Sequence, residues 1–409
     1  MELTVALVSP SWPAGSSCSG VTTYVAMARP GLEDRGARVV VLAHRVDDHC
    51  KATDVFCIRG EGEGAMSALI DRALRRIAPR YASERLVINA VLRAVHRVNR
   101  EVGLHVLEME ETFGWAGVVA QRSPVPVVVR LHCPACAAPP DCYGVQGEGV
   151  IKRRIRLERH SFERAHGVTA PSRAVLDAVR RHYGLELEKA RIIPNPIAPV
   201  PPEERWRLDG CDPDRILFVG RFDACKGADT VIDAFVLLAK ARSRCRLTFA
   251  GQDSGLRDAY GKIWKLEEYV RERVPEDLRS RIDFLNVQAH DRLARLRRAA
   301  YATVVPSRYE SFSYTAVEAM AAGCPLIASD AGGLSEIVED GVNGLLCRPG
   351  SPEDLAGKLE VLLRDRSLVE RLGLRAAMDC ERRYHPSIIA GQMLEFYREV
   401  IERWNGCRH

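Results

Sequence analysis

The chain has 409 residues, of which 46% are hydrophobic and 28% are charged. These values are typical of globular domains, and they exclude disordered, collagen-like and disulfide-stapled miniprotein classes. At about 150 residues per domain, the length predicts two or three domains. Lysine and arginine outnumber aspartate and glutamate by only 59 to 54, an excess too small for a dedicated nucleic-acid binder.

Thirteen cysteines are present, an odd number that cannot pair completely. The first ten residues form one short apolar segment without a basic flank, and no stretch approaches the roughly 18 apolar residues of a membrane span. We therefore expect neither a signal peptide nor a transmembrane helix. We expect the cysteine thiols to be reduced and the protein to be cytoplasmic.

The N-terminal half alternates short apolar runs with helical patterns. Brief, unbroken runs of valine, leucine and isoleucine are typical of strands in a parallel sheet that is covered on both faces. Strands are predicted at 3–9, 37–43, 104–110 and 125–132, and helices at 20–34 and 84–100.

A proline-rich segment divides the chain. Residues 193–213 contain six prolines, a composition that predicts a stiff linker between domains. The alternation then restarts, so the chain is expected to form two doubly wound α/β units. Strands are predicted at 216–219, 246–250, 281–285, 302–306 and 325–329, and helices at 228–240, 314–322, 352–364, 367–384 and 387–404.

The first motif of the second half is the loop Val-Gly-Arg-Phe-Asp-Ala-Cys-Lys-Gly at 219–227, between a predicted strand and a helix. A glycine at a strand end lets a ligand approach the backbone, and Arg221 and Lys226 supply two charges suited to a diphosphate. Only eight lysines occur in the chain, so a lysine here is less expected by chance. Taken alone, solvated loop charges are the simpler interpretation.

The second motif, at 306–319, carries Glu310 and, eight positions later, Glu318. Glu318 falls inside a predicted helix among apolar residues, where a carboxylate is costly unless it accepts hydrogen bonds, and ribose hydroxyls would donate them. The alternative is an ordinary charge on a helix surface. The start of this helix offers free amides and a favourable dipole to an anion. The residues concerned are Phe312, Ser313, Tyr314 and Thr315.

The third motif is Gly332-Gly333-Leu-Ser-Glu336, followed by Asn343-Gly344. The glycine pair is predicted to begin a helix and Asn343-Gly344 to form a turn. Each of these features can be purely structural when it is considered by itself.

Together, in this order and spacing between residues 219 and 346, the three motifs resemble the donor half of the retaining glycosyltransferase family 4. The resemblance implies the GT-B fold, an α/β architecture of two Rossmann-like domains facing across a cleft. It also implies that a hexose-type sugar moves, with retention of configuration, from UDP or GDP to a hydroxyl of a small metabolite, lipid or glycan. Two alternatives stay open: a nucleotide-sugar epimerase of the same fold, and a non-catalytic nucleotide-sugar-binding subunit.

The resemblance also implies roles for individual residues. Glu318 binds the ribose, and Glu310 faces the sugar hydroxyls or stabilises developing charge. Gly20 matches a close-approach glycine near the donor phosphates, although Ser19 departs from the family's glycine pair. The implied catalytic residues are His132, Glu310, Arg221 and Lys226, and the implied donor-binding residues are Gly20, Arg221, Lys226, Phe312, Ser313, Tyr314, Thr315 and Glu318.

The same resemblance divides the chain into an acceptor-binding domain at 1–200, a donor-binding domain at 201–385, and a helix at 386–409 that packs back on the first domain. Arg221 and Lys226 would offset the charge of the leaving group, and no cofactor and no metal are expected, because no metal-binding pair of aspartates is evident. The expected partners are a nucleotide sugar and a hydroxyl acceptor, without nucleic acid.

Other features have two interpretations each. Asn195 is either a polar site residue or a turn residue, and Asp253 is expected to be solvated rather than in contact with the nucleotide. Cys133, Cys136 and Cys142 suggest zinc by spacing, but a fourth ligand is not evident, and a loop for acceptor recognition is favoured. The basic segment 152–164 is expected to be a solvated helix face, with weak contact to a membrane surface as the alternative.

Overall fold

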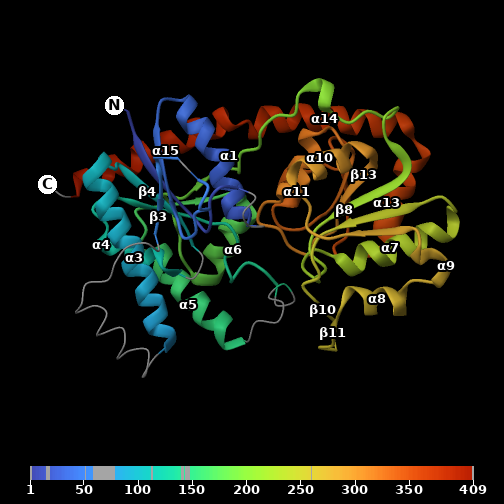
Figure 1. Cartoon of the computed structure of the whole chain (residues 1–409), viewed down its shortest axis with the longest axis horizontal. Coiled ribbons are helices and arrows are strands. Elements are labelled where there is room, and N and C mark those ends of the chain that lie inside the picture. Colours follow the sequence, from blue (N-terminus) through green and yellow to red (C-terminus); the bar gives the residue numbers. More distant parts are fainter. Residues whose placement is uncertain are drawn as a thin grey trace.

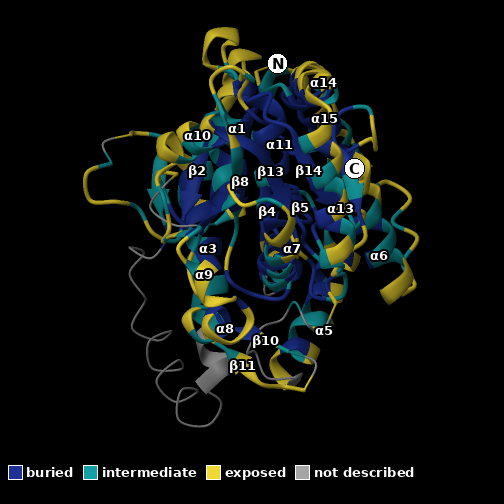
Figure 2. Cartoon of the chain, turned by 90° about the vertical axis from the view of Figure 1, so that its right-hand side faces the viewer, coloured by how far each residue is buried: buried dark blue, intermediate teal, exposed yellow. Residues whose placement is uncertain are grey.

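The computed structural model describes residues 2–14, 19–50, 52–58, 79–111, 114–139, 142, 148–258 and 260–407. Two parallel sheets, each covered by helices, form an N-terminal unit and a C-terminal unit that lie side by side along the longest axis (Figure 1). The prediction of two doubly wound α/β units is confirmed. The central strands of both sheets are buried inside the molecule, as Figure 2 shows.

The N-terminal sheet has the strand order β3-β2-β1-β4-β5-β6-β7. Its strands are apolar at consecutive positions because helices cover both faces of the sheet. In register, Val5 lies between Val39 and Val106. The strands are β1 (Thr4–Ser9), β2 (Arg38–Ala43), β3 (Val55–Cys57), β4 (Val106–Glu110), β5 (Val127–Arg130), β6 (Gly167–Ala170) and β7 (Arg191–Ile192).

Two apolar clusters sandwich this sheet. Side chains of α3 (Pro79–Val102), α4 (Ala116–Arg122), α5 (Glu148–Arg164) and α6 (Arg173–Tyr183) pack with one face. The other face packs against α1 (Gly20–Asp34). Successive residues of β4 therefore belong to opposite clusters, Val106 to the α1 side and Leu107 to the other.

The helix α15 (Pro386–Gly406) follows the C-terminal unit in sequence but packs on the N-terminal unit, alongside α1 (Figure 1). Phe396 and Tyr397 are fully buried there. The hydroxyls of Tyr24 and Tyr397 donate to the two oxygens of Glu108, at 2.6 and 2.8 Å. This pair of hydrogen bonds satisfies a carboxyl group in the core, where an unpaired one would be costly.

The C-terminal sheet has the order β12-β9-β8-β13-β14-β15. A short antiparallel hairpin of β10 (Leu256–Arg257) and β11 (Ile263–Trp264) stands apart from it. The strands of the main sheet are β8 (Asp212–Val219), β9 (Arg246–Ala250), β12 (Ile282–Leu285), β13 (Ala300–Val305), β14 (Leu326–Ser329) and β15 (Leu345–Cys347). The helices are α7 (Ala228–Ala241), α8 (Leu266–Arg273), α9 (Glu276–Arg279), α10 (His290–Ala299), α11 (Tyr314–Ala321), α12 (Leu334–Ile337), α13 (Pro352–Arg364) and α14 (Arg366–Tyr384).

Three of the predicted elements have boundaries that differ clearly from the structure. β8 begins at Asp212, inside the predicted linker, and Pro213 is tolerated because the pairing of β8 with β13 is irregular between Ala300 and Ala302. The helix predicted at 84–100 begins earlier, at Pro79. The strand predicted at 125–132 is shorter, so His132 lies two residues beyond the end of β5.

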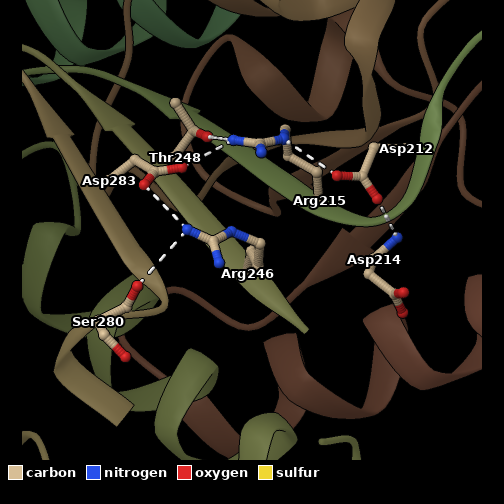
Figure 3. A network of polar contacts seen from close by, with 7 residues as sticks. All are labelled: Asp212, Asp214, Arg215, Arg246, Thr248, Ser280 and Asp283. Carbon is tan, nitrogen blue, oxygen red and sulfur yellow. Dashed lines mark hydrogen bonds and ion pairs between the residues drawn. The ribbon is translucent and has the colours of Figure 1, made fainter. Parts of the chain in front are cut away.

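A polar network joins three neighbouring strands near their amino ends (Figure 3). Arg215 of β8 donates to Thr248 and to Asp283, each at 2.8 Å, and Arg246 donates to the other oxygen of Asp283 at 3.1 Å. The network therefore lies at the edge of the sheet opposite to the loops that follow the strands. None of the helices in the described part of the chain has the length and apolar content needed to cross a membrane.

Candidate active site

The loops that follow β8, β9 and β13 meet at the carboxyl edge of the C-terminal sheet, where ligands of open α/β sheets bind. Glycines allow them to touch. A Cβ atom on Gly251 would lie 1.9 Å from the carbonyl oxygen of Gly220, and one on Gly227, which has a φ of +68°, would lie 2.0 Å from that of Pro306. The first motif is therefore built around backbone contacts that only glycine permits.

Lys226 and Glu310 form the central ion pair of this edge. The Nζ atom of Lys226 lies 2.7 Å from Oε1 of Glu310, and Ser307 donates to the same oxygen at 2.9 Å. Burial opposes the charged form of Lys226, but the attraction of Glu310 outweighs it and raises the pKa of Lys226. The lysine is therefore a fixed positive charge at neutral pH.

Asp223 organises the basic loop, although the sequence analysis did not single it out. Its Oδ2 atom accepts from Nε of Arg221 at 2.7 Å, and its Oδ1 atom accepts from the amide of Lys226 at 2.8 Å. Arg221 is half exposed, with its side chain at 50%, whereas Asp223 is buried. A signal was available, because aspartate commonly accepts hydrogen bonds from backbone amides in turns.

Arg308 ties the first and second motifs together and was also missed. Its guanidinium forms a two-pronged pair with Asp229 at 2.8 and 2.7 Å and donates to the carbonyl of Ala224 at 2.6 Å. Its own amide donates to the carbonyl of Cys225 at 2.8 Å. A fork of this kind fixes both distance and angle, so the position of Lys226 relative to Glu310 is well determined.

The predicted anion-binding segment opens α11. Ser313 is its N-cap and accepts from the amide of Ala316 at 3.4 Å, and Tyr314 and Thr315 are the first two helical residues. Phe312 and Tyr314 contact each other edge to face, with ring centres 5.9 Å apart. Tyr314 packs against the apolar clusters of both units, so this helix start lies at their junction.

Glu318 lies on α11 as predicted, but its partner is a protein side chain. It forms an ion pair with Arg297 of α10, which is 2% exposed, and His290 Nδ1 lies 3.7 Å from its other oxygen. The desolvation cost that we expected ribose hydroxyls to offset is therefore offset in part by Arg297. Sequence reasoning did not identify Arg297, which lies 21 residues earlier in the chain.

His132 follows β5 in the N-terminal unit and is held by Glu111. The two oxygens of Glu111 accept from the amides of His132 and Cys133, at 2.9 and 2.8 Å. The imidazole packs edge to face on Tyr24, with ring centres 5.1 Å apart. Burial, assisted by the nearby Arg130, holds the pKa of His132 well below its ordinary value, so the ring is neutral.

Three other positions singled out in the sequence are Gly20, Asn195 and Asp253. Gly20 is the first residue of α1, and a Cβ atom there would have no neighbour within 4 Å, so no contact with the described residues requires glycine. Asn195 accepts from the buried Arg130 at 2.6 Å and thus serves the core of the N-terminal unit. Asp253 is exposed, and its carboxylate accepts from the amides of Gly255 and Leu266 at 2.9 and 3.0 Å.

The cysteine loop of the N-terminal unit consists of ordinary thiols. Cys136 is partly buried, and this burial raises its pKa to about 12, so it is not a thiolate at neutral pH. Among the described residues, no group of three or more histidine, cysteine, aspartate or glutamate side chains is arranged to hold a metal ion. The neighbouring Glu110 is buried, and this raises its pKa to about 8.

The structure thus brings Lys226 and Glu310 into direct contact and holds Arg221 on the same loop through Asp223. Glu318 lies on α11 with a separate partner, and His132 belongs to the facing unit. The residues that sequence reasoning missed share one property. Asp223 and Arg308 lie within the first and second motifs and Arg297 lies outside them, but each of the three pairs with protein groups and holds a motif residue in place.

Comparison with known proteins gives matches over both units. The Glycosyltransferase Family 4 model matches residues 18–199, and the model for glycosyl transferases group 1 matches residues 204–378. A D-inositol 3-phosphate glycosyltransferase from Xylanimonas cellulosilytica is 32% identical over 317 residues, which cover 71% of this chain and 70% of that protein. An alpha-D-kanosaminyltransferase from Streptomyces kanamyceticus is 27% identical over 331 residues, 76% of this chain and 81% of that one.

Among solved structures, the sucrose-phosphate synthase from Thermosynechococcus elongatus superposes with a TM-score of 0.73 at 22% identity, covering 98% of this chain and 100% of that one. At that identity the likeness concerns the fold, and it agrees with the two parallel-sheet units described above. With its two halves matched in order by the two family models, the chain belongs to the family 4 type of GT-B glycosyltransferases.

Proposed function

We propose that this glycosyltransferase takes a hexose-type sugar from a nucleoside diphosphate, UDP or GDP, and transfers it with retention to a hydroxyl of a small metabolite, lipid or glycan. The C-terminal unit binds the donor, and the N-terminal unit supplies His132 and the acceptor-binding surface. The observation that carries the proposal is the cationic loop, in which Lys226 pairs with Glu310 and Arg221 is held on the same loop by Asp223.

Several features support a nucleoside diphosphate as the donor. A diphosphate needs strong, directed positive charge, and Arg221 and Lys226 both have pKa values above their ordinary range. The start of α11 adds free amides and the positive end of a helix dipole. A structure of Anabaena Alr3699/HepE in complex with UDP-glucose, 19% identical to this chain, has a similar fold with a TM-score of 0.67.

In the proposed reaction, the bond between the anomeric carbon and the diphosphate breaks while the acceptor oxygen forms its bond on the same face of the sugar. The leaving diphosphate accepts the proton of the acceptor hydroxyl. Arg221 and Lys226 stabilise the charge that develops on the leaving group, and Glu310 faces the sugar. His132 is neutral at physiological pH, so its imidazole contributes hydrogen bonds rather than charge.

We propose that no metal takes part, since two side-chain cations already face the charge of the diphosphate. Activity is then expected to be unchanged after treatment with EDTA. Contact with an anionic membrane surface is at most weak, because arginines of α5 are engaged by acidic side chains. The pairs are Arg153 with Glu84, Arg154 with Glu158 and Arg159 with Glu163. The described cysteines are free thiols, which supports a cytoplasmic location.

The test is incubation of the purified chain with a panel of UDP- and GDP-sugars, with and without sugar, polyol and glycan acceptors. Release of nucleotide only in the presence of an acceptor, with a product of retained configuration, is the expected result. A new nucleotide-sugar isomer without acceptor would instead identify an epimerase, and donor binding without turnover under any acceptor would identify a non-catalytic subunit.

A further inference from the structure

The start of α6 in the N-terminal unit is capped by a side chain of the C-terminal unit. Oε2 of Glu336 accepts from the amide of Arg173 at 2.9 Å, and Oε1 accepts from the amide of Ala174 at 2.7 Å. The residues are more than 160 positions apart in the chain, with separations of 163 and 162. The next amide, of Val175, is satisfied within α6 by the hydroxyl of Ser172 at 3.4 Å.

The carboxylate of Glu336 thus pairs with the first amides of α6 across the junction of the two units. The first amides of a helix have no partner within the helix, and a carboxylate beside them is favoured by both hydrogen bonding and the helix dipole. Glu336 itself is exposed at the rim of the junction. Beneath it lies a buried contact between the same two segments, because the hydroxyl of Ser172, 2% exposed, donates to the carbonyl of Ser311 at 2.8 Å.

The capping carboxylate is directly connected to the candidate active site. The amide of Gly333, three residues before Glu336, donates to the carbonyl of Glu310 at 2.7 Å. A Cβ atom on Gly333 would lie 2.3 Å from the carbonyl oxygen of Ser311 and 3.2 Å from the hydroxyl of Ser172. No spare space separates α6 from the backbone of Glu310, so a displacement of one must displace the other.

The same segment is anchored where the chain crosses between the units. Arg383, near the end of α14, donates to the carbonyl of Glu336 at 2.6 Å and to that of Ile337 at 3.3 Å. The next residue, Tyr384, accepts at its carbonyl from the amide of Ile197, at 2.9 Å, in the segment that joins the two units. Arg383 thus holds the backbone of Glu336 on the side where the chain crosses between the units, while the carboxylate of Glu336 holds the start of α6.

From these contacts we propose that Glu336 is a positioning residue for sugar transfer. Its carboxylate holds the start of α6 against the loops at Glu310 and Ser311, and this sets the separation between the donor loops and the facing edge of the N-terminal unit. The inference rests on the proposed function, in which the donor lies on one unit and the acceptor on the other. It predicts that Glu336 matters for the reaction between them and not for nucleotide binding by the C-terminal unit alone.

The test compares Glu336→Ala and Glu336→Gln with Glu339→Gln, an exposed carboxylate three residues further on. For Glu336→Ala we expect the dissociation constant for UDP or GDP to stay within about twofold, while kcat/KM for the acceptor falls about tenfold or more, because small misplacements of reacting groups are costly. Glu336→Gln keeps one acceptor oxygen, so its kcat/KM for the acceptor should lie between those of Glu336→Ala and the wild type. Glu339→Gln should match the wild type in every measurement.

Small-angle scattering supplies a readout that does not depend on activity. Glu336→Ala should widen the distribution of interatomic distances, and Ser172→Ala should do the same, with the double variant showing less than the sum of the two effects because both act on one contact. The inference is overturned if Glu336→Ala scatters and turns over like Glu339→Gln, or if it loses nucleotide affinity and acceptor kinetics in equal measure. If the wild-type chain binds neither nucleotide, the proposed donor is wrong, and the scattering comparison still decides the role of Glu336.

Discussion

The ammonium group of Lys226 lies 2.7 Å from the carboxylate of Glu310, although 84 residues separate the two in sequence. A diphosphate that approaches Lys226 must compete with that carboxylate, so donor binding is expected to redirect the lysine and release Glu310 toward the sugar. The ion pair is therefore understood as the resting arrangement of two groups that remain coupled through their contact.

Lys226→Ala is expected to lower kcat by about 10²–10³-fold, the usual effect of removing one group that stabilises developing charge. Lys240→Ala, which removes an exposed lysine of α7, serves as the matched control and should leave kcat unchanged. Steady-state kinetics with the best donor check the pair. Equal activity of both variants and the wild type would contradict the assignment of Lys226 to the diphosphate.

A cycle with Glu310→Gln tests whether the two groups act together. Because Lys226 and Glu310 are in contact, the double variant should lose less activity than the product of the two single effects. The same variants are compared by kcat/KM for the donor. Fully multiplicative effects would mean that the two groups act independently.

The ion pair of Glu318 with Arg297 and its proposed role in ribose binding can be tested separately. Glu318→Ala removes the partner of the buried Arg297 and should destabilise the chain by roughly 3–5 kcal/mol, as expected for a buried charge left alone. Adding Arg297→Met should restore most of this stability but not the affinity for nucleoside diphosphate, if Glu318 binds the ribose. Denaturant titration measures the first quantity and calorimetric titration the second. Recovery of both would show that Glu318 serves the fold alone.

The pKa of Glu110, raised to about 8 mainly by burial and then by the neighbouring Glu111, leads to a prediction about stability and pH. A carboxyl group with a raised pKa in the folded state contributes fully below its unfolded pKa, and this contribution is lost as pH rises through about 8. Glu110→Gln should therefore gain in melting temperature relative to the wild type between about pH 5 and about pH 9. The exposed Glu395→Gln should show no such trend.

The network of Figure 3 offers a perturbation far from the proposed site. Asp283→Ala leaves Arg215 and Arg246 without a shared acceptor and should cost about 1 kcal/mol, because these side chains are partly exposed and screened by water. Asp214 contributes only its backbone amide to the network, so Asp214→Ala is the control. Thermal melts should separate the two variants by a few degrees, and kcat/KM should be equal for both. A fall in kcat/KM for Asp283→Ala would contradict the separation of this edge from the site.

Elements with one clear signal could be predicted from the sequence. The apolar strands β1 and β2 match the predicted runs to within one residue, because a parallel sheet buried on both faces leaves continuous apolar segments. The helix α6 was not predicted, although its signals were present. Ser172 is its N-cap, and Gly184, with a φ of +63°, ends it in the left-handed conformation.

The motifs at Arg221, Glu310 and Glu318 could be placed on a loop or a helix from sequence because each follows an apolar strand. The protein groups that contact these motifs could not be identified from the sequence. Arg297 beside Glu318 and the start of α6 beside Glu336 depend on how elements distant in sequence pack together. A spacing rule within one helix or one loop has no means of detecting such contacts.

The packing of α15 on α1 has a consequence for how the chain is made. The ribosome completes the entire C-terminal unit before α15 emerges. During most of synthesis, Tyr24 and Glu108 therefore lack their packing and hydrogen-bonding partner Tyr397. Domains usually fold one after another as they leave the exit tunnel. Here the first unit cannot finish before the second has been translated, and its apolar α1 face is open to chaperones until then.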